Sequence, residues 1–163
     1  MRTLENIQNK IISRSDLPKI ITLIKAQNKK IVFSNGCFDL VHRGHVEYLA
    51  KAADLGNIFI LGLNTDASVQ RLKGKSRPLQ DEYARSVLMA GFSFINYIVL
   101  FDEDTPFELI NEIVPDVLVK GDDYKIEDVV GYETVINNGG SVQTIELTKG
   151  YSTSIIVDKI LNT

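Results

Sequence analysis

Five short runs of apolar residues dominate the pattern of this sequence from residue 31 onward. The runs are IVF (31–33), IFILGL (58–63), YIVLF (97–101), DVLVK (116–120) and SVQTIEL (141–147). Apolar runs that are rich in β-branched and aromatic residues are typical of strands buried on both faces. Segments with helical spacing separate the runs or follow them, at 44–55, 66–73, 81–92, 105–113, 127–138 and 153–161. This alternation predicts a doubly wound α/β fold with a five-stranded parallel sheet.

The first thirty residues show a different pattern. Two groups of apolar residues recur there at helical spacing: Leu4, Ile7, Ile11 and Ile12, and then Leu17, Ile20, Leu23 and Ile24. Ser15 and Asp16 stand between the groups and are typical of a helix start. We therefore expect two helices that form an N-terminal extension over residues 1–29, beside an α/β core over 30–163. The length of 163 residues is that of one domain, and no internal repeat divides it.

The charge balance and the cysteine count limit the partners and the compartment. Eighteen Lys and Arg residues against 21 Asp and Glu give a net charge of −3. Bulk electrostatics therefore provides no attraction to nucleic acid or to an anionic membrane. No run approaches the length of a membrane span, and the start MRTLENIQNK lacks the apolar block of a signal peptide. The only cysteine, Cys37, cannot form an internal disulfide, which fits a reducing compartment. We expect a cytoplasmic protein with neither nucleic acid nor membrane as a partner.

Ligands of parallel α/β sheets bind beyond the carboxyl ends of the strands. The segments in that position are 34–45, 64–77, 120–125 and 148–154, and the first contains both histidines of the chain. His42 and His45 flank Gly44 in the sequence S-N-G-C-F-D-L-V-H-R-G-H, at the expected entry to a helix. Free N–H groups at a helix start suit a phosphate, and imidazoles add further donors. Incidental histidines at a helix start are the alternative. No further His or Cys cluster offers the ligands of a zinc site, so we expect no protein-bound metal.

The stretch G-C-F-D-L-V-H-R-G-H resembles the signature of the nucleotidyltransferase superfamily, which includes cytidylyltransferases and bacterial ADP-heptose synthases. Four later stretches are similar to those of heptose 1-phosphate adenylyltransferases: N-T-D-A-S-V-Q-R-L-K-G-K-S-R-P (64–78), F-D-E-D-T-P (101–106), P-D-V-L-V-K-G-D-D-Y (115–124) and G-Y-S-T-S (150–154). The resemblance covers residues 30–162. It implies a Rossmann-like nucleotidyltransferase fold in which residues 30–163 are the catalytic core.

The implied reaction is attack by an oxygen of a sugar 1-phosphate on the α-phosphorus of ATP. With D-glycero-β-D-manno-heptose 1-phosphate, the products are ADP-heptose and pyrophosphate, and Mg²⁺ assists. The pathway that the resemblance implies is the synthesis of lipopolysaccharide or another heptose-containing glycan. Such a reaction requires positioning and charge neutralisation more than a nucleophilic side chain.

The resemblance also assigns roles to residues at the expected site. The catalytic residues that it implies are His42, His45 and Lys73. The nucleotide-binding residues that it implies are Asn35, Gly36, Cys37, Phe38, Gly44, Lys120, Gly121, Asp122, Asp123, Ser152, Thr153 and Ser154. Further candidates for the sugar phosphate are Asp39, Asp66, Lys75, Arg77 and Arg85.

Several of these residues also have simpler interpretations. Ser152–Ser154 are typical of a helix N-cap, Cys37 of a small packing residue, and Asp39 of a residue that supports its loop. Arg85 has the spacing for a surface ion pair with Asp81.

The nucleobase is less constrained than the reaction. Heptose enzymes more often have K-G-G-D-Y where this chain has K-G-D-D-Y, and G-D-D resembles cytidylyltransferases that make CDP-glycerol or a related CDP-alcohol. However, L-T-K-G-Y-S-T lacks the arginine and glutamate of the cytidylyltransferase stretch R-T-E-G-I-S-T, so we favour ATP over CTP. A silent nucleotide-binding module is disfavoured because His42, Gly44 and His45 are all present. A tRNA synthetase fragment is disfavoured by length.

Two expectations concern partners. Relatives of this kind associate, and the N-terminal helices add apolar surface, so we expect a homodimer. A sugar kinase is fused to this domain in many relatives, and 163 residues leave no room for one, so we expect a separate heptose 7-phosphate kinase.

Overall fold

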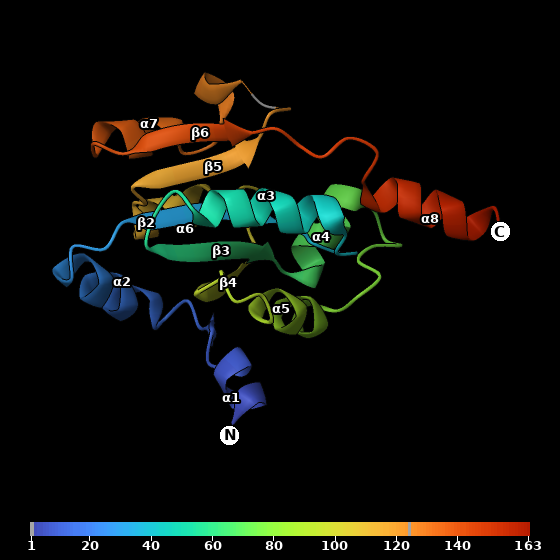
Figure 1. Cartoon of the computed structure of the whole chain (residues 1–163), viewed down its shortest axis with the longest axis horizontal. Helices are drawn as coiled ribbons and strands as arrows, with labels where there is room; N and C mark the ends of the chain where they lie inside the picture. Colours follow the sequence, from blue (N-terminus) through green and yellow to red (C-terminus); the bar gives the residue numbers. More distant parts are fainter. Residues whose placement is uncertain (1, 124) are drawn as a thin grey trace.

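The computed structural model describes residues 2–123 and 125–163, and its elements form a parallel sheet between two layers of helices (Figure 1). The strands are β1 (Ile11–Ile12), β2 (Ile31–Gly36), β3 (Ile58–Asn64), β4 (Tyr97–Phe101), β5 (Val117–Gly121) and β6 (Ser141–Ile145). The helices are α1 (Thr3–Gln8), α2 (Leu17–Ala26), α3 (Arg43–Ala53), α4 (Asp66–Lys73), α5 (Glu82–Ala90), α6 (Phe107–Ile113), α7 (Tyr132–Asn137) and α8 (Thr153–Leu161), with a 3₁₀ turn η1 (Ile126–Asp128). The doubly wound α/β fold is confirmed, and among the described residues no helix is long and apolar enough to cross a membrane.

The sheet has six strands in the described chain, where the sequence predicts five. The additional strand is β1, which lies inside the segment expected to be the first helix. Ile11 pairs with Ile98 and Ile12 with Val99, both in parallel with β4. Helix α1 ends at Gln8, and Lys10 donates hydrogen bonds from Nζ to the carbonyl oxygens of Ala90 and Phe92 at 3.0 and 2.9 Å. Pairing with the edge of β4 therefore makes residues 11–12 a strand. The local spacing of apolar residues cannot predict such a long-range contact.

The segment 127–138 also differs from its predicted single helix. It contains the end of η1 and then α7, and Gly131 between them has a φ of +89°. Helical φ values are negative, so the chain cannot continue as one helix through this glycine.

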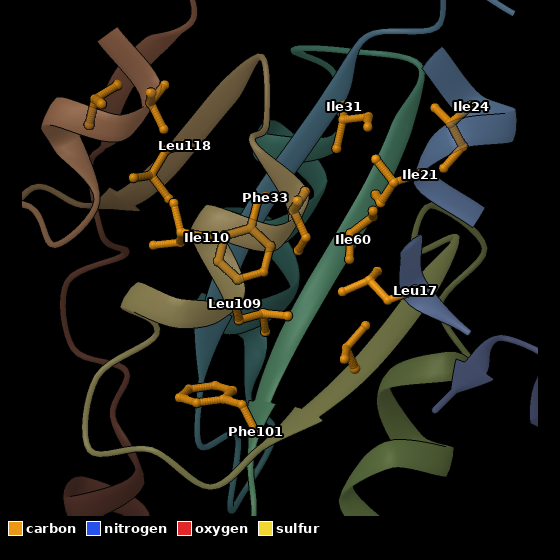
Figure 2. Close-up of a cluster of buried hydrophobic side chains, with 14 of the residues drawn as sticks. Leu17, Ile21, Ile24, Ile31, Phe33, Ile60, Phe101, Leu109, Ile110 and Leu118 are labelled. Carbon is orange, nitrogen blue, oxygen red and sulfur yellow. The ribbon is translucent and has the colours of Figure 1, made fainter. Parts of the chain in front are cut away.

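Side chains on the two faces of the sheet form two separate hydrophobic clusters. Helices α2 and α6 cover one face together with α7 (Figure 2), where the buried residues include Leu17, Ile21, Phe33, Ile60, Leu109, Ile110, Leu118 and Val135. Helices α3 and α5 cover the other face, where the buried residues include Val32, Tyr48, Leu49, Leu61, Met89, Ile98 and Val117. Both faces of the strands are thus buried, which accounts for their continuous apolar runs.

The strand order β1-β4-β3-β2-β5-β6 places a topological switch at β2. The chain proceeds from β2 outward through β3 and β4, and then returns to β5 on the other side of β2. Neighbouring crossovers on opposite faces leave a crevice where β2 and β5 end, and this is where such sheets bind ligands. Gly36 and Gly121 are the last residues of these two strands.

Candidate active site

A cavity of about 400 Å³ opens at the carboxyl ends of β2 and β5. Its lining contains most of the residues that the resemblance implies: Asn35, Gly36, Cys37, Phe38, Asp39, His42, Gly44, His45, Lys73, Lys120, Gly121, Asp123, Ser152, Thr153 and Ser154. They come from the loop between β2 and α3, from the ends of α4 and β5, and from the start of α8. Four segments that are distant in the sequence therefore meet at one site.

His42 and His45 lie against one another in this cavity. Their ring centroids are 3.7 Å apart with an interplanar angle of 19°, and Phe38 packs with its ring edge-on to His45 at 5.1 Å. His42 is the N-cap residue of α3, and Nδ1 of its ring is buried without a hydrogen-bond partner among the described residues. An added Cβ at Gly44 would lie 3.1 Å from that Nδ1 and 3.3 Å from Cβ of Tyr151. Glycine at this position therefore lets both side chains lie against the first turn of α3.

Burial and neighbouring groups keep both imidazoles neutral at neutral pH. Burial lowers the pKa of His45 to about 4, and His42 and Lys73 contribute to the decrease. Burial also lowers the pKa of His42. A bound polyphosphate would oppose these effects, because an adjacent anion favours the protonated ring. The site is thus able to gain positive charge when an anion enters it.

Lys120 provides a cation where β5 ends. Its Nζ donates a hydrogen bond to Oδ1 of Asn35 at the end of β2. Burial lowers the pKa of Lys120 to about 8, so the side chain remains mostly protonated at pH 7. The contact between Lys120 and Asn35 joins the two strands at the switch point.

Tyr48 was missed by the sequence analysis although it lines the cavity. Its hydroxyl donates to the carbonyl oxygen of Val119 at 3.1 Å and shares a hydrogen bond with Oγ of Ser34 at 2.8 Å. Burial raises its pKa to about 12, so it remains a neutral phenol. Tyr48 follows His45 by three residues on α3, and this helical spacing is the signal that could have identified it.

The segment before α8 forms the side of the cavity that faces α3. The cavity lining also includes Leu147, Thr148 and Tyr151. The sequence motifs did not predict these residues as part of the site, because only the fold brings them there. Oγ1 of Thr148 donates to Oε2 of Glu47 at 2.7 Å, and the guanidinium of Arg43 lies 5.4 Å from the ring centroid of Tyr151. These contacts connect the approach to α8 with helix α3.

Ser152 has the N-cap role that its position suggests. Its Oγ accepts a hydrogen bond from the backbone N–H of Ile155 at 3.2 Å. Ser152, Thr153 and Ser154 also line the cavity, so capping and exposure to a ligand coexist at the start of α8.

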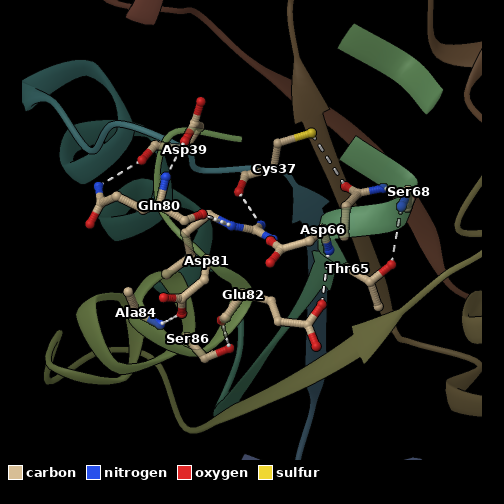
Figure 3. A network of polar contacts seen from close by, with 12 residues as sticks. Cys37, Asp39, Thr65, Asp66, Ser68, Gln80, Asp81, Glu82, Ala84 and Ser86 are labelled. Atoms are coloured by element: carbon tan, nitrogen blue, oxygen red, sulfur yellow. Dashed lines mark hydrogen bonds and ion pairs between the residues drawn. The ribbon is translucent and has the colours of Figure 1, made fainter. Parts of the chain in front are cut away.

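Arg85 lies outside the cavity lining and is completely buried. Figure 3 shows the polar network around it, with Cys37, Asp66 and Gln80 labelled. Arg85 donates to the carbonyl oxygens of Gln80 at 3.1 Å and Cys37 at 2.7 Å, and to Oδ1 of Asp66 at 2.8 Å. The alternative ion pair with Asp81 is wrong, because Asp81 instead accepts the N–H of Ala84 and caps α5. Arg85 and Asp66 thus position the loop after β2 from behind the cavity.

Asp39 supports its loop, as the simpler interpretation suggests. Its buried carboxylate accepts hydrogen bonds from Arg77 at 2.8 Å and from the N–H groups of Leu79 and Gln80 at 2.7 and 3.1 Å. Although burial opposes ionisation, these donors together lower the pKa of Asp39. Arg77 and Asp39 therefore fix the segment that follows Lys73 to the loop that precedes His42.

Three other predicted residues have distinct placements. Oδ1 of Asp122 accepts the N–H of Leu147 at 3.2 Å, and Asp122 is not part of the cavity lining. Lys75 is exposed and also lies outside the lining. Cys37 is half-buried in the cavity wall, and burial raises the pKa of its thiol. Tyr124, the last residue of the stretch P-D-V-L-V-K-G-D-D-Y, lies outside the described residues.

A parallel sheet with a His-x-Gly-His helix start at its switch point, opposite a second helix start and flanked by lysines, defines a nucleotidyltransferase site. The chain belongs to the cytidylyltransferase-like family, whose model matches residues 33–159.

Curated relatives agree with this family. The bifunctional protein HldE of Campylobacter jejuni subsp. doylei is 50% identical over 155 residues, which are 95% of this chain and 32% of the relative. The protein of the same name from Citrifermentans bemidjiense is 53% identical over 154 residues, 94% of this chain and 32% of the relative. The chain thus spans about a third of the length of these relatives.

Solved structures share the fold. The lipopolysaccharide core biosynthesis protein of Thermoplasma volcanium is 27% identical with a TM-score of 0.61, over 76% of this chain and 99% of that one. The pantoate-β-alanine ligase of Francisella tularensis shares the fold alone, at 11% identity and a TM-score of 0.56, over 94% of this chain and 78% of that one.

Proposed function

We propose that this chain transfers AMP from ATP to D-glycero-β-D-manno-heptose 1-phosphate, giving ADP-heptose and pyrophosphate. The observation that carries the proposal is the stacked pair of His42 and His45 at the start of α3, in one cavity with the start of α8. Identities of about 50% to proteins named bifunctional protein HldE add support. A neighbour named as a lipopolysaccharide core biosynthesis protein supports the same pathway.

The proposed roles follow from where charge develops. An oxygen of the sugar phosphate attacks the α-phosphorus, and the bond from this phosphorus to the pyrophosphate oxygen breaks. His42, His45 and Lys73 neutralise the charge on the transferring and leaving phosphates, and the amides of Ser152–Ser154 bind the terminal phosphates. Gly121, the last residue of β5, faces the ribose and base. Asn35, Gly36 and Lys120 lie near the α-phosphorus.

Mg²⁺ is proposed to enter with the nucleotide. Among the described residues no group of three or more His, Cys, Asp and Glu side chains could hold a metal ion. Asp39 is already bonded to Arg77 and to two backbone N–H groups. Asp123 is therefore the carboxylate that best fits a second contact to the ion. Mg²⁺ typically retains several waters and binds substrate phosphates with one or two carboxylates, which suits this donor set. When bound, it neutralises phosphate charge.

The quaternary state and the supply of the sugar phosphate are proposed as well. We infer a homodimer, which is supported by apolar side chains of α8 that are half or more exposed, such as Ile155, Ile160 and Leu161. Light scattering after size exclusion tests it, and a monomeric mass would contradict it.

We also propose a separate heptose 7-phosphate kinase that acts earlier. The test supplies heptose 7-phosphate together with a phosphatase. Formation of ADP-heptose by the two proteins together, and not by this chain alone, would support this order.

The test of the reaction is product analysis with both nucleotides. The protein and Mg²⁺ are incubated with heptose 1-phosphate and either ATP or CTP, and pyrophosphate release and nucleotide-sugar mass are measured. We expect ADP-heptose with ATP and little product with CTP. Turnover with CTP alone would instead support a cytidylyltransferase, and absence of product with both would contradict the substrate assignment.

A further inference from the structure

Two neighbouring strands of the sheet separate from each other as they approach the cavity. Strands β2 and β5, both described in full, pair at Val32 with Val117 and at Phe33 with Leu118, and not beyond. Strand β2 nevertheless remains paired with β3 up to its last residue, and β5 remains paired with β6 up to its last residue. Each strand thus keeps its outer neighbour while the contact between the two is lost.

The unpaired ends, Ser34–Gly36 of β2 and Val119–Gly121 of β5, border a gap that we call the split. Four of their residues line the cavity: Asn35, Gly36, Lys120 and Gly121. Strands joined by a continued ladder of backbone hydrogen bonds would lie only about 4.8 Å apart and would close this gap. The split is therefore part of the space that a ligand enters.

Tyr48 of α3 bridges the first position of the split. Its hydroxyl donates to the carbonyl oxygen of Val119 at 3.1 Å and lies 2.8 Å from Oγ of Ser34. Because a phenol has a single proton, Ser34 is the donor in the second contact. Ser34 and Val119 directly follow the last paired residues of their strands, and all three residues are buried. A side chain of α3 thus replaces the backbone pairing at this position.

The next position is bridged by Lys120, whose Nζ donates to Oδ1 of Asn35. Successive side chains of a strand point to opposite faces of the sheet. Val119 belongs to the hydrophobic cluster on the face that α3 covers, so the side chain of Lys120 starts from the other face. The two bridges therefore hold the split from opposite faces of the sheet.

Loss of the phenol hydroxyl would leave two buried polar groups without this partner, the carbonyl oxygen of Val119 and the hydroxyl of Ser34. Unpaired polar groups in a protein interior are destabilising. The cost is relieved when water or the opposite strand fills the split. A nucleotide would then have to displace that water or separate the strands before it could bind.

We propose that Tyr48 is a positioning residue that keeps the split between β2 and β5 open for the nucleotide. Its hydroxyl is engaged by Ser34 and Val119, so it acts on the ligand through the two strands. This inference rests on the proposed function, because it assumes that the nucleotide enters this cavity.

Tyr48→Phe tests the role, since it keeps the ring and removes the bridge. We expect the Kd of a non-hydrolysable ATP analogue with Mg²⁺ and the KM for ATP to rise about tenfold. The kcat should stay within about threefold, because loss of uniform binding affects KM alone. Titration calorimetry and pyrophosphate release measure these quantities. Tyr132→Phe is the matched control that should change neither, because Tyr132 is half-buried on α7 and lies outside the cavity lining. A lower melting temperature of Tyr48→Phe with unchanged Kd and KM would overturn the proposal.

Ser34→Ala removes the other end of the bridge and provides an independent test. Tyr48 can still donate to Val119 in this variant, so we expect a smaller increase in Kd, about threefold. If both residues act through one bridge, the double variant should bind the analogue about as weakly as Tyr48→Phe alone. Effects that multiply in the double variant would overturn the shared bridge. Should Tyr48→Phe fail to fold, an unchanged Kd in Ser34→Ala would overturn the proposal by itself.

The outcomes also separate this inference from the proposed function. Product formation by the unchanged protein tests the reaction by itself. If the unchanged protein binds the ATP analogue but makes no ADP-heptose, weaker binding by Tyr48→Phe still supports the positioning role while the proposed reaction fails. If the unchanged protein makes ADP-heptose and Tyr48→Phe binds nucleotide normally, the positioning role alone is overturned. An unchanged protein that binds no nucleotide would overturn both.

Discussion

His42 and His45 line one cavity, but their surroundings differ. His45 lies between the His42 ring and Phe38, and burial lowers its pKa to about 4. His42 retains a buried Nδ1 without a partner among the described residues. Two neutral imidazole rings can stack at this distance, whereas two protonated rings would repel each other. An incoming polyphosphate compensates for that repulsion, so charge at the site depends on the ligand.

Replacement of either histidine should lower turnover without unfolding the chain. We expect His42→Ala or His45→Ala to decrease kcat by about 10²-fold or more, because each removes a donor from the developing charge. Pyrophosphate release measures kcat, and circular dichroism verifies the fold. Asp54→Asn serves as the control that should retain activity, because Asp54 is exposed at the C-terminal end of α3, away from the cavity. Near-normal turnover by both histidine variants would contradict the proposed mechanism.

The low pKa of His45 predicts a stability that decreases in mild acid. The unfolded chain takes up a proton at a pKa near 6.5, whereas folded His45 does so only near 4. Between these pH values the unfolded state binds more protons, so the free energy of unfolding decreases as the pH falls. We expect His45 to lower the free energy of unfolding by roughly 2–3 kcal/mol over this pH range, a value that already allows for its partial exposure to solvent.

Urea denaturation between pH 7 and pH 4 measures this slope. His45→Asn should reduce the slope, and His42, whose pKa is lowered in the same direction, should account for part of the remainder. An identical slope in His45→Asn and the unchanged protein would show that His45 is protonated normally in the fold.

Single residues of the site could be predicted only where a motif marks them. The segments after the predicted strands contain His42, His45, Lys73 and Lys120, and the fold does bring these into one cavity. Tyr48 and Leu147 belong to no such motif. Arg85 and Asp66 were candidates for ligand contact, but their mutual ion pair is satisfied within the protein. Sequence spacing does not distinguish a residue that binds a ligand from one that holds the loop behind it.

Between elements, Arg85 connects α5 with α4 and with the loop after β2. Its three acceptors are the carbonyl oxygens of Gln80 and Cys37 and the carboxylate of Asp66. Removal of such a buried cation is destabilising, because the Asp66 carboxylate and the two carbonyl oxygens lose their hydrogen-bond donor.

We therefore expect Arg85→Met to reduce the free energy of unfolding by about 3–5 kcal/mol. The loop that carries Cys37 and Phe38 would shift, so the KM for ATP should also rise. Urea denaturation and steady-state kinetics measure the two effects. Arg2→Met is the matched control, because Arg2 forms an exposed ion pair with Glu5 on α1, away from the cavity, and should change stability and KM little. Equal stabilities of the two variants would contradict the role given to Arg85.

Elements with long apolar runs were predictable, and those set by distant contacts were not. The five predicted strands and the helices at 66–73 and 153–161 are present, with the last strand ending at Ile145. Strand β1 has two residues and exists because β4 offers an unpaired edge. Residues 127–138 contain helical spacing, but the positive φ of Gly131 interrupts it. The spacing of apolar residues indicates which face of a helix or strand is buried. It does not indicate which neighbouring segment provides the backbone hydrogen bonds.

Across the whole molecule, the sheet and α8 differ in how they are held. Strands β2 and β3 pair over six residues and are mostly buried, whereas no residue of α8 is buried. A nine-residue helix with so little tertiary packing is marginal in water. Figure 1 shows α8 at one side of the molecule, after the long segment that follows β6. Yet the first residues of α8 line the cavity with His42 and His45 from α3. A nucleotide in the cavity would therefore bridge a stable element and a weakly held one.

Hydrogen exchange should reveal this difference. Without nucleotide, we expect the amides of α8 to exchange far faster than those of β2 and β3, because local opening costs little where few contacts are lost. Addition of a non-hydrolysable ATP analogue with Mg²⁺ should slow exchange in α8 and leave β2 and β3 nearly unchanged, since the ligand stabilises the state that binds it. Repeating the measurement at a tenfold lower protein concentration separates this effect from dimerisation. Protection by the nucleotide is independent of protein concentration, whereas protection by a second copy declines on dilution. If α8 is as protected as β2 without nucleotide at both concentrations, its stability arises within the chain and the proposed bridge is wrong.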